Sequence, residues 1–499
     1  MAVIDSGVGA PGGSSSILEI NNLAAAQSEV NQMLVGYTRN IFNNTPSKPQ
    51  AIYSEGDEIV FDFPSSRDFL NIPGSQFMFD LKIYWKECEA NERESSIGVS
   101  IAHIFDRLQV FNGSVKVEHI DEYGKYVFHE FKSKTVAGGE YLAHGYFGGI
   151  FPYTNGITHI YRNAANLPHS SCLMSDLVYP SSGAGVNKEV MVRVIFPVKT
   201  LFERSGYLPI GNIFKGLQFR FKIASHLNFA WLSKVTDGGA SPDYRTGENG
   251  KYFEITNPVW KMDSLRYSLG SMPAMGEHVF HTFGTRVNRL AIETYANARY
   301  ILDYNWSSLK RCVSFVDPAK NEKIGYRLAA NSTGSVLQLV VPWGQGYWCA
   351  GDNYEYWYDA GTVRYPEEDP VSDLRSGWYH YLKSVHMQDI AGDFSDTCGG
   401  INRDVDIANN YAFGVFAAGV YMCAKFDKLD QSGSIISGTD VSNRYVILNV
   451  DMEPDAIYHD VTGYGKGADF DNDVEAERYV ICNYDVFIIL YGGAIAIQD

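Results

Sequence analysis

The stretch Ile195–Ala224, IFPVKTLFERSGYLPIGNIFKGLQFRFKIA, gives the clearest indication of how this chain folds. Leu217, Phe219, Phe221 and Ile223 alternate with polar residues. This period of two predicts a strand with one apolar and one polar face. An earlier strand ends at a proline, and a Leu-Pro-Ile step precedes the second strand. The pattern is typical of antiparallel sheets that are buried on one side.

The same period recurs through most of the chain. It is clear in EIVFDF (58–63), FMFDLKIYW (77–85) and EVMVRVIFPV in the first half, and in RVNRLAIETY, RYVILNVDME and the closing AERYVICNYDVFIILYGGAIAI in the second. Asn112-Gly113 predicts a tight hairpin between two strands, because this pair suits positive φ angles. Helical periodicity is scarce outside the N-terminal segment, so the sequence predicts an all-β protein with long loops.

The length of 499 residues exceeds what one hydrophobic core usually organises. All-β domains often reach roughly 200–250 residues, which favours two large domains. TDGGASPDYRTGENGK is polar and rich in turn residues. We therefore expect two consecutive eight-stranded jelly-roll sandwiches, a double jelly roll, with the first over 51–235 and the second over 256–499. A linker or exposed loop at 236–255 joins them.

An N-terminal arm over residues 1–50 precedes the first sandwich. Ser16 and Glu19 form the pattern of a capping box, and Asn-Asn-Thr-Pro closes the segment. We expect an amphipathic helix over 17–42 that packs on its own β domain or docks onto a neighbouring subunit, and both alternatives stay open. The apolar stripe of this assembly arm consists of Ile20, Leu23, Val30, Leu34, Tyr37 and Ile41.

Charge and cysteine content limit the function. The 58 acidic and 41 basic residues give a formal charge of −17, and no Lys/Arg run forms a basic patch. We therefore expect no sequence-specific binding of nucleic acid. The seven cysteines include no C-x-x-C pair, which suits a reducing compartment.

Sequence motifs for catalysis are not found. The chain has no phosphate-binding P-loop, no G-x-S-x-G and no H-E-x-x-H. Gly7-x-Gly9-x-x-Gly12 matches a dinucleotide fingerprint, but no strand precedes it and Pro11 interrupts it. We expect a protein that is not an enzyme, with no catalytic residues and no cofactor.

One acidic run is a weak candidate for calcium. Acids recur at every second position, as in a calcium-binding loop. An EF-hand would need glycine and a later acid where Val474 and Val480 stand, so a solvated acidic loop is the favoured interpretation. The residues of this candidate are Asp469, Asp471, Asp473 and Glu475.

Aromatic clusters keep a second function class open. GYWCAGDNYEYWY (346–358) suits the stacking of sugars. It equally suits a contact with a neighbouring subunit, where Tyr and Trp are enriched. The alternative is therefore a carbohydrate-binding or glycoside-hydrolase-like β-sandwich protein.

The order of four stretches resembles a known family. They are VFNGSVKVEHIDEYGKY, with Glu118, Ile120 and Tyr123; the FPVKTLFERSGYLPIGNIFKGLQFRFKI stretch; GVYMCAKFDKLDQSGSIISGTDVSNRYVILNV; and YVICNYDVFIILYGGAIAI. Together they resemble the double jelly-roll major capsid proteins of adenovirus (hexon), virophages, polinton-like viruses, adintoviruses and large eukaryotic DNA viruses. The likeness covers about a third of the chain directly, in both halves.

The resemblance implies a structural subunit. Such a protein forms pseudo-hexameric homotrimers, or capsomers, that tile an icosahedral shell. Its expected partners are other copies of itself, penton proteins, minor capsid or cement proteins, and an internal membrane reached through minor proteins. The expected location is the virion capsid, after synthesis in the host cell cytoplasm.

Overall fold

The computed structural model describes residues 37–85, 93–94, 101–132, 188–225, 234–235, 253–267, 278–291, 297–318, 337–338, 344–350, 353–357, 422–426, 438–452, 459–460, 476–491 and 494–498. Strands dominate these ranges, as the alternating sequence pattern predicted.

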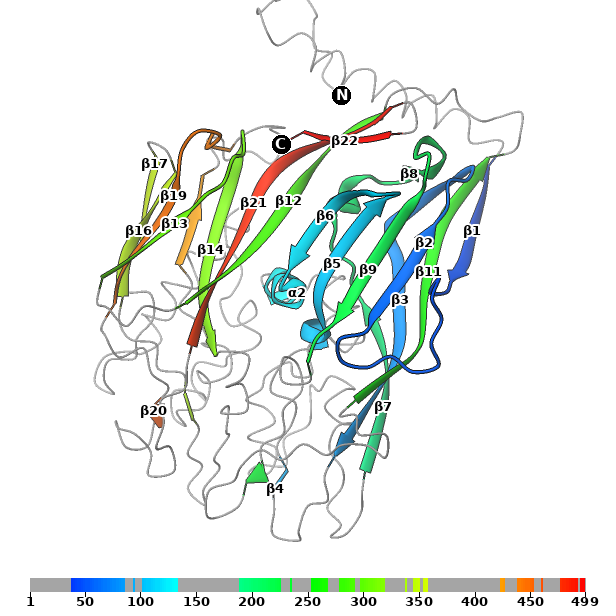
Figure 1. Cartoon of the computed structure of the whole chain (residues 1–499), viewed down its shortest axis with the longest axis horizontal. Helices are drawn as coiled ribbons and strands as arrows, with labels where there is room; N and C mark the ends of the chain where they lie inside the picture. The colour runs from blue at the N-terminus through cyan, green and yellow to red at the C-terminus, as the bar shows by residue number, and fades with distance from the viewer. Residues whose placement is uncertain are drawn as a thin grey trace, which may run out of the picture.

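The first sandwich consists of two antiparallel sheets, A and B (Figure 1). Sheet A has the order β1-β11-β3-β7, with β1 (Tyr37–Asn44), β11 (Phe253–Tyr267), β3 (Asp68–Trp85) and β7 (Lys188–Phe196). Sheet B has the order β2-β9-β5-β6, with β2 (Glu58–Phe63), β9 (Leu217–Ile223), β5 (Phe105–Asn112) and β6 (Val115–Asp121).

The second sandwich also has two antiparallel sheets, C and D. Sheet C has the order β12-β21-β14-β18, with β12 (His278–Ala291), β21 (Ala476–Tyr491), β14 (Leu309–Pro318) and β18 (Met422–Lys425). Sheet D has the order β13-β19-β16-β17, with β13 (Asn297–Leu302), β19 (Val446–Met452), β16 (Gly344–Ala350) and β17 (Asn353–Trp357).

Short elements complete the described part of the chain. β8 (Leu208–Pro209) pairs with β3, β22 (Ala494–Gln498) pairs with β21, and two small sheets join β4 (Arg93–Glu94) to β10 (Lys234–Val235) and β15 (Leu337–Gln338) to β20 (His459–Asp460). The helices are α2 (Tyr123–Lys132) and the 3-10 turns η1 (Ile101–Ile104), η3 (Leu201–Arg204) and η4 (Ile210–Asn212). Within the described ranges, none of the helices has the length and apolar character that a membrane crossing requires.

Both sandwiches have the same strand order. When the eight strands of the two sheets in each sandwich are numbered along the chain, sheets A and C both read 1-8-3-6, and sheets B and D both read 2-7-4-5. The chain therefore passes between sheets at every step except the fourth to the fifth strand. This order, present twice in one chain, is the double jelly roll that the sequence predicted.

The core of the first sandwich confirms the alternation of apolar and polar residues predicted for β9. Leu217, Phe219, Phe221 and Ile223 are buried, and the residues between them are half-buried. Across the sandwich, the ring of Phe77 on sheet A lies 5.0 Å from that of Phe221 on sheet B. Edge and offset contacts of this kind add to the free energy of area burial.

The expected division of the chain is wrong at β11. This strand overlaps the predicted linker at 236–255 and the predicted second sandwich, yet it pairs with β3 and β1. Its Trp260 is fully buried 5.0 Å from the Phe219 ring, and burial of such a side chain contributes roughly 2–3 kcal/mol. Strand 8 thus closes the first sandwich, which spans strands from Tyr37 to Tyr267.

The expected helix over 17–42 is wrong at its C-terminal end. Tyr37–Asn44 forms strand β1, which pairs along its whole length with β11. The apolar residues Ile41 and Phe42 lie on this edge strand and are 58% and 37% exposed. Backbone pairing with β11 overrides the helical spacing of the side chains. The remaining stripe residues, Ile20, Leu23, Val30 and Leu34, lie outside the described residues.

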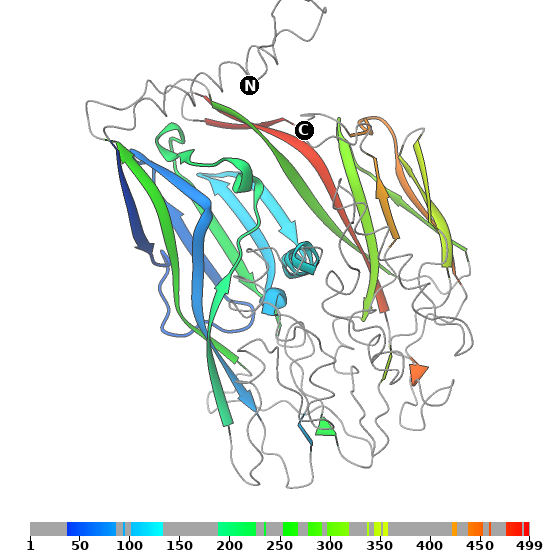
Figure 2. The same ribbon diagram turned by 180° about the vertical axis from the view of Figure 1, so that it is seen from behind.

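Helix α2 was not expected. Glu122 has a positive φ of 52°, which ends β6 and turns the chain into the helix. Tyr123, Tyr126 and Val127 are buried at helical spacing. The helix lies between the first sandwich and strands β12 and β21 of the second (Figures 1 and 2).

Candidate functional site

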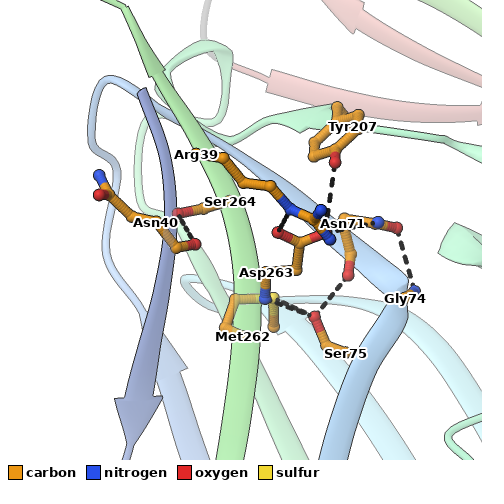
Figure 3. A network of polar contacts seen from close by, with 9 residues as sticks. All are labelled: Arg39, Asn40, Asn71, Gly74, Ser75, Tyr207, Met262, Asp263 and Ser264. Atoms are coloured by element: carbon orange, nitrogen blue, oxygen red, sulfur yellow. Dashed lines mark hydrogen bonds and ion pairs between the residues drawn. The ribbon is translucent and has the colours of Figure 1, made fainter. Parts of the chain in front are cut away.

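A polar network on sheet A anchors the first strand of the fold. The Asp263 carboxylate accepts hydrogen bonds from Arg39 Nε at 2.8 Å, Arg39 Nη2 at 3.0 Å, Asn71 Nδ2 at 3.0 Å and Tyr207 Oη at 3.2 Å (Figure 3). The hydrogen bond from Arg39 is the main reason that the pKa of Asp263 lies below its ordinary value. Burial, and then the charge of Asp263, raise the pKa of Tyr207. An ionised carboxylate with all these donors anchors a strand and does not transfer protons.

An irregular bulge in β3, with four residues opposite one, positions this network. Ile72–Ser75 lies opposite the single residue Met262, because the register shifts between Lys261 and Asp263. The Ser75 hydroxyl accepts the Asp263 backbone N–H at 3.0 Å, and Asn71 Oδ1 accepts the Gly74 N–H at 3.0 Å (Figure 3). The bulge also changes which residues of β3 face the core. Before it the even-numbered Leu70 and Ile72 do so, and after it the odd-numbered Phe77 and Phe79 do.

Two further Arg–Asp ion pairs link the other neighbouring strands of sheet A. Arg266 donates two hydrogen bonds to Asp68, at 2.7 and 2.9 Å, and Arg193 forms a two-bond pair with Asp80. With the Arg39 pair, one such ion pair therefore spans every strand boundary of the order β1-β11-β3-β7. In each pair the carboxylate is largely buried and the arginine is more than half exposed.

The second feature of the site is the junction between the sandwiches. Phe202 on η3 is fully buried, and its ring lies 6.3 Å from Phe219 in the first sandwich and 6.5 Å from Phe280 on β12. Next to it, the Arg204 guanidinium lies 3.8 Å from the centre of the Phe283 ring. The buried residues of sheets A and B therefore form one continuous cluster with Val287, Ile481 and other residues of sheet C.

Helix α2 adds charged contacts to this junction. Arg311 of β14 forms an ion pair with Glu130 of α2. The Lys125 ammonium of α2 lies 4.8 Å from the centre of the Tyr479 ring on β21. Such contacts are strongest where water is excluded, so α2 helps to fix one sandwich against the other.

Two stretches that carried the family resemblance meet in this junction. Glu118 of β6 accepts a hydrogen bond from the Thr200 hydroxyl and one from the Leu201 N–H at 2.9 Å. Tyr123 Oη donates to the Lys199 carbonyl at 2.9 Å and accepts the Lys199 N–H at 2.8 Å. Burial raises the pKa of Glu118 to about 7. These bonds hold the turn that carries Phe202 against the second sandwich.

Asp485 is the polar centre of the second sandwich near the junction. It accepts hydrogen bonds from His281 Nε2 at 2.7 Å and from the Ser308 hydroxyl, and the Lys310 ammonium lies 3.6 Å away. Burial raises its pKa, but these partners more than offset the effect and leave the pKa below its ordinary value.

The group differs from a catalytic triad because aspartate, not histidine, contacts the serine. The Ser308 oxygen accepts the Gly438 N–H at 3.0 Å while its proton goes to Asp485. Ser308 is itself buried, so the group does not present this hydroxyl to solvent. The arrangement holds β12, β14 and β21 together.

Of the site residues predicted from the sequence, Tyr37 and Ile41 lie on β1, the strand that carries Arg39. Asp469, Asp471, Asp473 and Glu475, the weak calcium candidate, are outside the described residues. Inside the described ranges, no group of three metal-ligating side chains is present. Sequence reasoning missed Arg39, Asp263 and the Glu118 contacts, because the partners are distant in the chain; for Glu118, the family-like stretch was the only local signal.

Comparison with known proteins shows that solved structures share this fold. No protein-family model and no curated protein matches the chain. Among solved structures, the chain is similar to one in the capsid of PBCV-1 virus, with a TM-score of 0.55 and 8% identity over 93% of this chain and 97% of that chain. It is also similar to a chain in the cryo-EM structure of the Sputnik virophage, with a TM-score of 0.50 and 11% identity over 93% and 88% of the two chains. At these identities the likeness establishes the double jelly-roll fold alone.

Proposed function

We propose that this chain is the major capsid protein of an icosahedral virus, a structural subunit and not an enzyme. The observation that carries the proposal is the repeated strand order, with two jelly rolls in one chain and the core of the first continuing onto sheet C of the second. The fold likeness to a chain of the PBCV-1 virus capsid, over 93% of this chain, supports it.

The building block is a homotrimer. Two similar sandwiches give each subunit two similar wedges, and three subunits closed around a threefold axis give a pseudo-hexamer of six. Cyclic contacts that close in this way leave no open end. A capsomer of this shape tiles near-hexagonal positions in a shell, with penton and minor capsid or cement proteins at the remaining positions. An internal membrane is reached only through minor proteins, and nucleic acid is not bound sequence-specifically.

Charge governs the assembly hierarchy. With a formal charge of −17, subunits repel one another unless contacts are complementary or salt screens them. Contacts within the trimer are therefore large and apolar, and contacts between trimers are smaller and polar. The protein is made in the host cytoplasm and resides in the virion.

The N-terminal segment assists assembly. Strand β1 carries it to an edge of sheet A, where Ile41 and Phe42 are exposed. An apolar sheet edge invites pairing with a further chain. We expect the segment before Tyr37 to lie on the inner side of the shell, against its own jelly roll, a neighbouring subunit or a minor protein.

Light scattering coupled to size-exclusion chromatography tests the building block. The expected result is a stable trimer at all salt concentrations, with larger assemblies that vary with salt. A monomer that binds glycans on a glycan array would instead support the carbohydrate-binding alternative. Trimers that dissociate on mild dilution while larger assemblies persist would contradict the hierarchy.

A truncation tests the arm. Deletion of residues 1–36 keeps β1, so trimers should form while complete shells fail to form with the other viral proteins. The control is the full-length chain with Phe214→Ala, a change at a residue that is 76% exposed on the loop before β9. Complete shells from the truncated protein would show that the arm is passive.

A further inference from the structure

Two cysteines face each other inside the second sandwich. Cys312 of β14 and Cys482 of β21 occupy directly opposite positions on neighbouring antiparallel strands. Their Sγ atoms lie 3.2 Å apart, and both side chains are fully buried in the core between sheets C and D.

This placement suits a covalent link. A disulfide needs Cα atoms roughly 4.4–6.8 Å apart. Directly opposite residues on antiparallel strands have Cα atoms about 4.5 or 5.5 Å apart, so either kind of pair meets that requirement. With the sulfur atoms already in contact, bond formation needs only a small side-chain movement and no shift in strand register.

We propose that Cys312 and Cys482 form a reversible disulfide across sheet C when the protein meets a two-electron oxidant, namely a peroxide or a small-molecule disulfide. The two S–H bonds break and one Sγ–Sγ bond forms. Hydrogen peroxide takes up the two electrons and two protons and leaves as two water molecules, whereas a small-molecule disulfide leaves as two thiols.

The link joins the third and eighth strands of the second sandwich. It closes a loop between residues 170 positions apart, which restricts the unfolded chain far more than the folded one. Because both thiols are buried, the oxidant reaches them only when the sheet opens locally, so oxidation is slow and mild denaturant accelerates it. The thiols stay reduced in a cytosolic glutathione pool and become oxidised outside it.

The inference goes beyond the proposed function, since it needs only the pairing of β14 with β21. Cys349 of β16 offers a matched control. It is also buried, but it is not part of the core cluster that holds Cys312 and Cys482, although its neighbours Trp348 and Ala350 are. In the strand pairing it lies opposite Ile447 of β19 and Tyr354 of β17.

The test uses the purified full chain treated with oxidised glutathione in mild urea. Remaining thiols are then alkylated under denaturing conditions, and peptides are mapped by mass spectrometry without reduction. The expected product is a linked peptide pair containing Cys312 and Cys482, which dithiothreitol reverses. Oxidation should raise the melting temperature of the wild type and of Cys349→Ser, and should not raise that of Cys312→Ala or Cys482→Ala.

Two results would overturn the proposal. One is recovery of both cysteines in alkylated form after prolonged oxidation. The other is a linked peptide that joins either residue to a different cysteine while the rise in melting temperature persists in Cys312→Ala. The peptide map of the wild type decides the question even if an alanine variant does not fold.

Discussion

Arg39 and Asp263 form a two-bond ion pair although they lie 224 positions apart in the chain. Arg39 is on the first strand of the first jelly roll, and Asp263 is on the eighth. The pair therefore holds in place the strand that begins the fold and the strand that closes the first sandwich.

Removal of this pair should weaken sheet A. Arg39→Ala should lower the free energy of unfolding by about 1 kcal/mol, because Arg39 is 63% exposed and water screens the pair. Asp263→Ala should cost about 2 kcal/mol, since Asn71 and Tyr207 lose their shared acceptor. Urea denaturation at neutral pH measures both.

Lys261→Ala, an exposed change on the same strand, is the control and should stay within about 0.5 kcal/mol of the wild type. The pH matters because the pKa of Asp263 is lowered in the folded state. The stabilisation is complete above the ordinary value of 3.8 and is lost as pH falls through the lower folded-state pKa. Equal effects of Arg39→Ala and Lys261→Ala would show that the pair does not contribute.

Glu118 should make the protein less stable as pH rises from about 4.5 to about 7. Its pKa is raised from 4.5 to about 7, so the folded protein holds a proton that the unfolded chain releases. The loss is on the order of 3 kcal/mol and levels off above pH 7. Glu118→Gln still accepts the Leu201 N–H and can donate to the Thr200 hydroxyl oxygen, and it should have a flatter profile over this range.

Calorimetry of both proteins at several pH values checks this. The difference between the two profiles is the relevant quantity, because other groups titrate in the same range; burial lowers the pKa of His278, for example. Parallel profiles for wild type and Glu118→Gln would contradict the prediction.

The two sandwiches should unfold together, because the buried cluster of the first sandwich continues onto sheet C of the second. Phe202→Ala removes a ring between Phe219 and Phe280 and should cost about 3–5 kcal/mol. It should also split or broaden a single calorimetric transition. Phe214→Ala, at an exposed position in the same region, should leave the transition unchanged. Two separate transitions in the wild type would mean that the shared core does not couple the sandwiches.

The two N-terminal truncations should differ in stability. A chain that starts at residue 37 keeps all of sheet A, but one that starts at residue 46 lacks β1 and exposes the edge of β11. The shorter chain should therefore melt at a lower temperature and aggregate more. Thermal melts with light scattering measure both, and equal behaviour would show that β1 does not contribute to the sandwich.

Two glycines in the stretch that opened the sequence analysis provide a matched comparison. Gly206 and Gly216 have φ angles of 61° and 67°. A Cβ at Gly206 has no atom within 4 Å, whereas one at Gly216 would lie 2.1 Å from the Phe63 carbonyl oxygen. Gly206→Ala should cost about 1 kcal/mol for the strained backbone alone, and Gly216→Ala clearly more. Similar melting temperatures for the two variants would contradict this.

The sequence predicted the individual strands well because their signal is local. The bounds of EIVFDF match β2, and the alternation of Leu217 to Ile223 matches the buried face of β9. The Asn112-Gly113 hairpin joins β5 to β6, with Gly113 at φ 60°. Each of these depends on side chains within a few residues of one another, and a period of two is visible in a single strand.

Tertiary structure alone decided which strands belong to which sandwich. The sequence determined an all-β chain of two jelly rolls, but it assigned most of β1 to a helix and most of β11 to the second sandwich. It showed no sign of the Arg39–Asp263 and Glu118–Leu201 contacts. The order 1-8-3-6 places the last strand beside the first, so the pairing of these two strands joins residues more than two hundred positions apart. A local pattern shows that a strand has a buried face, but only the folded chain shows which face it packs against.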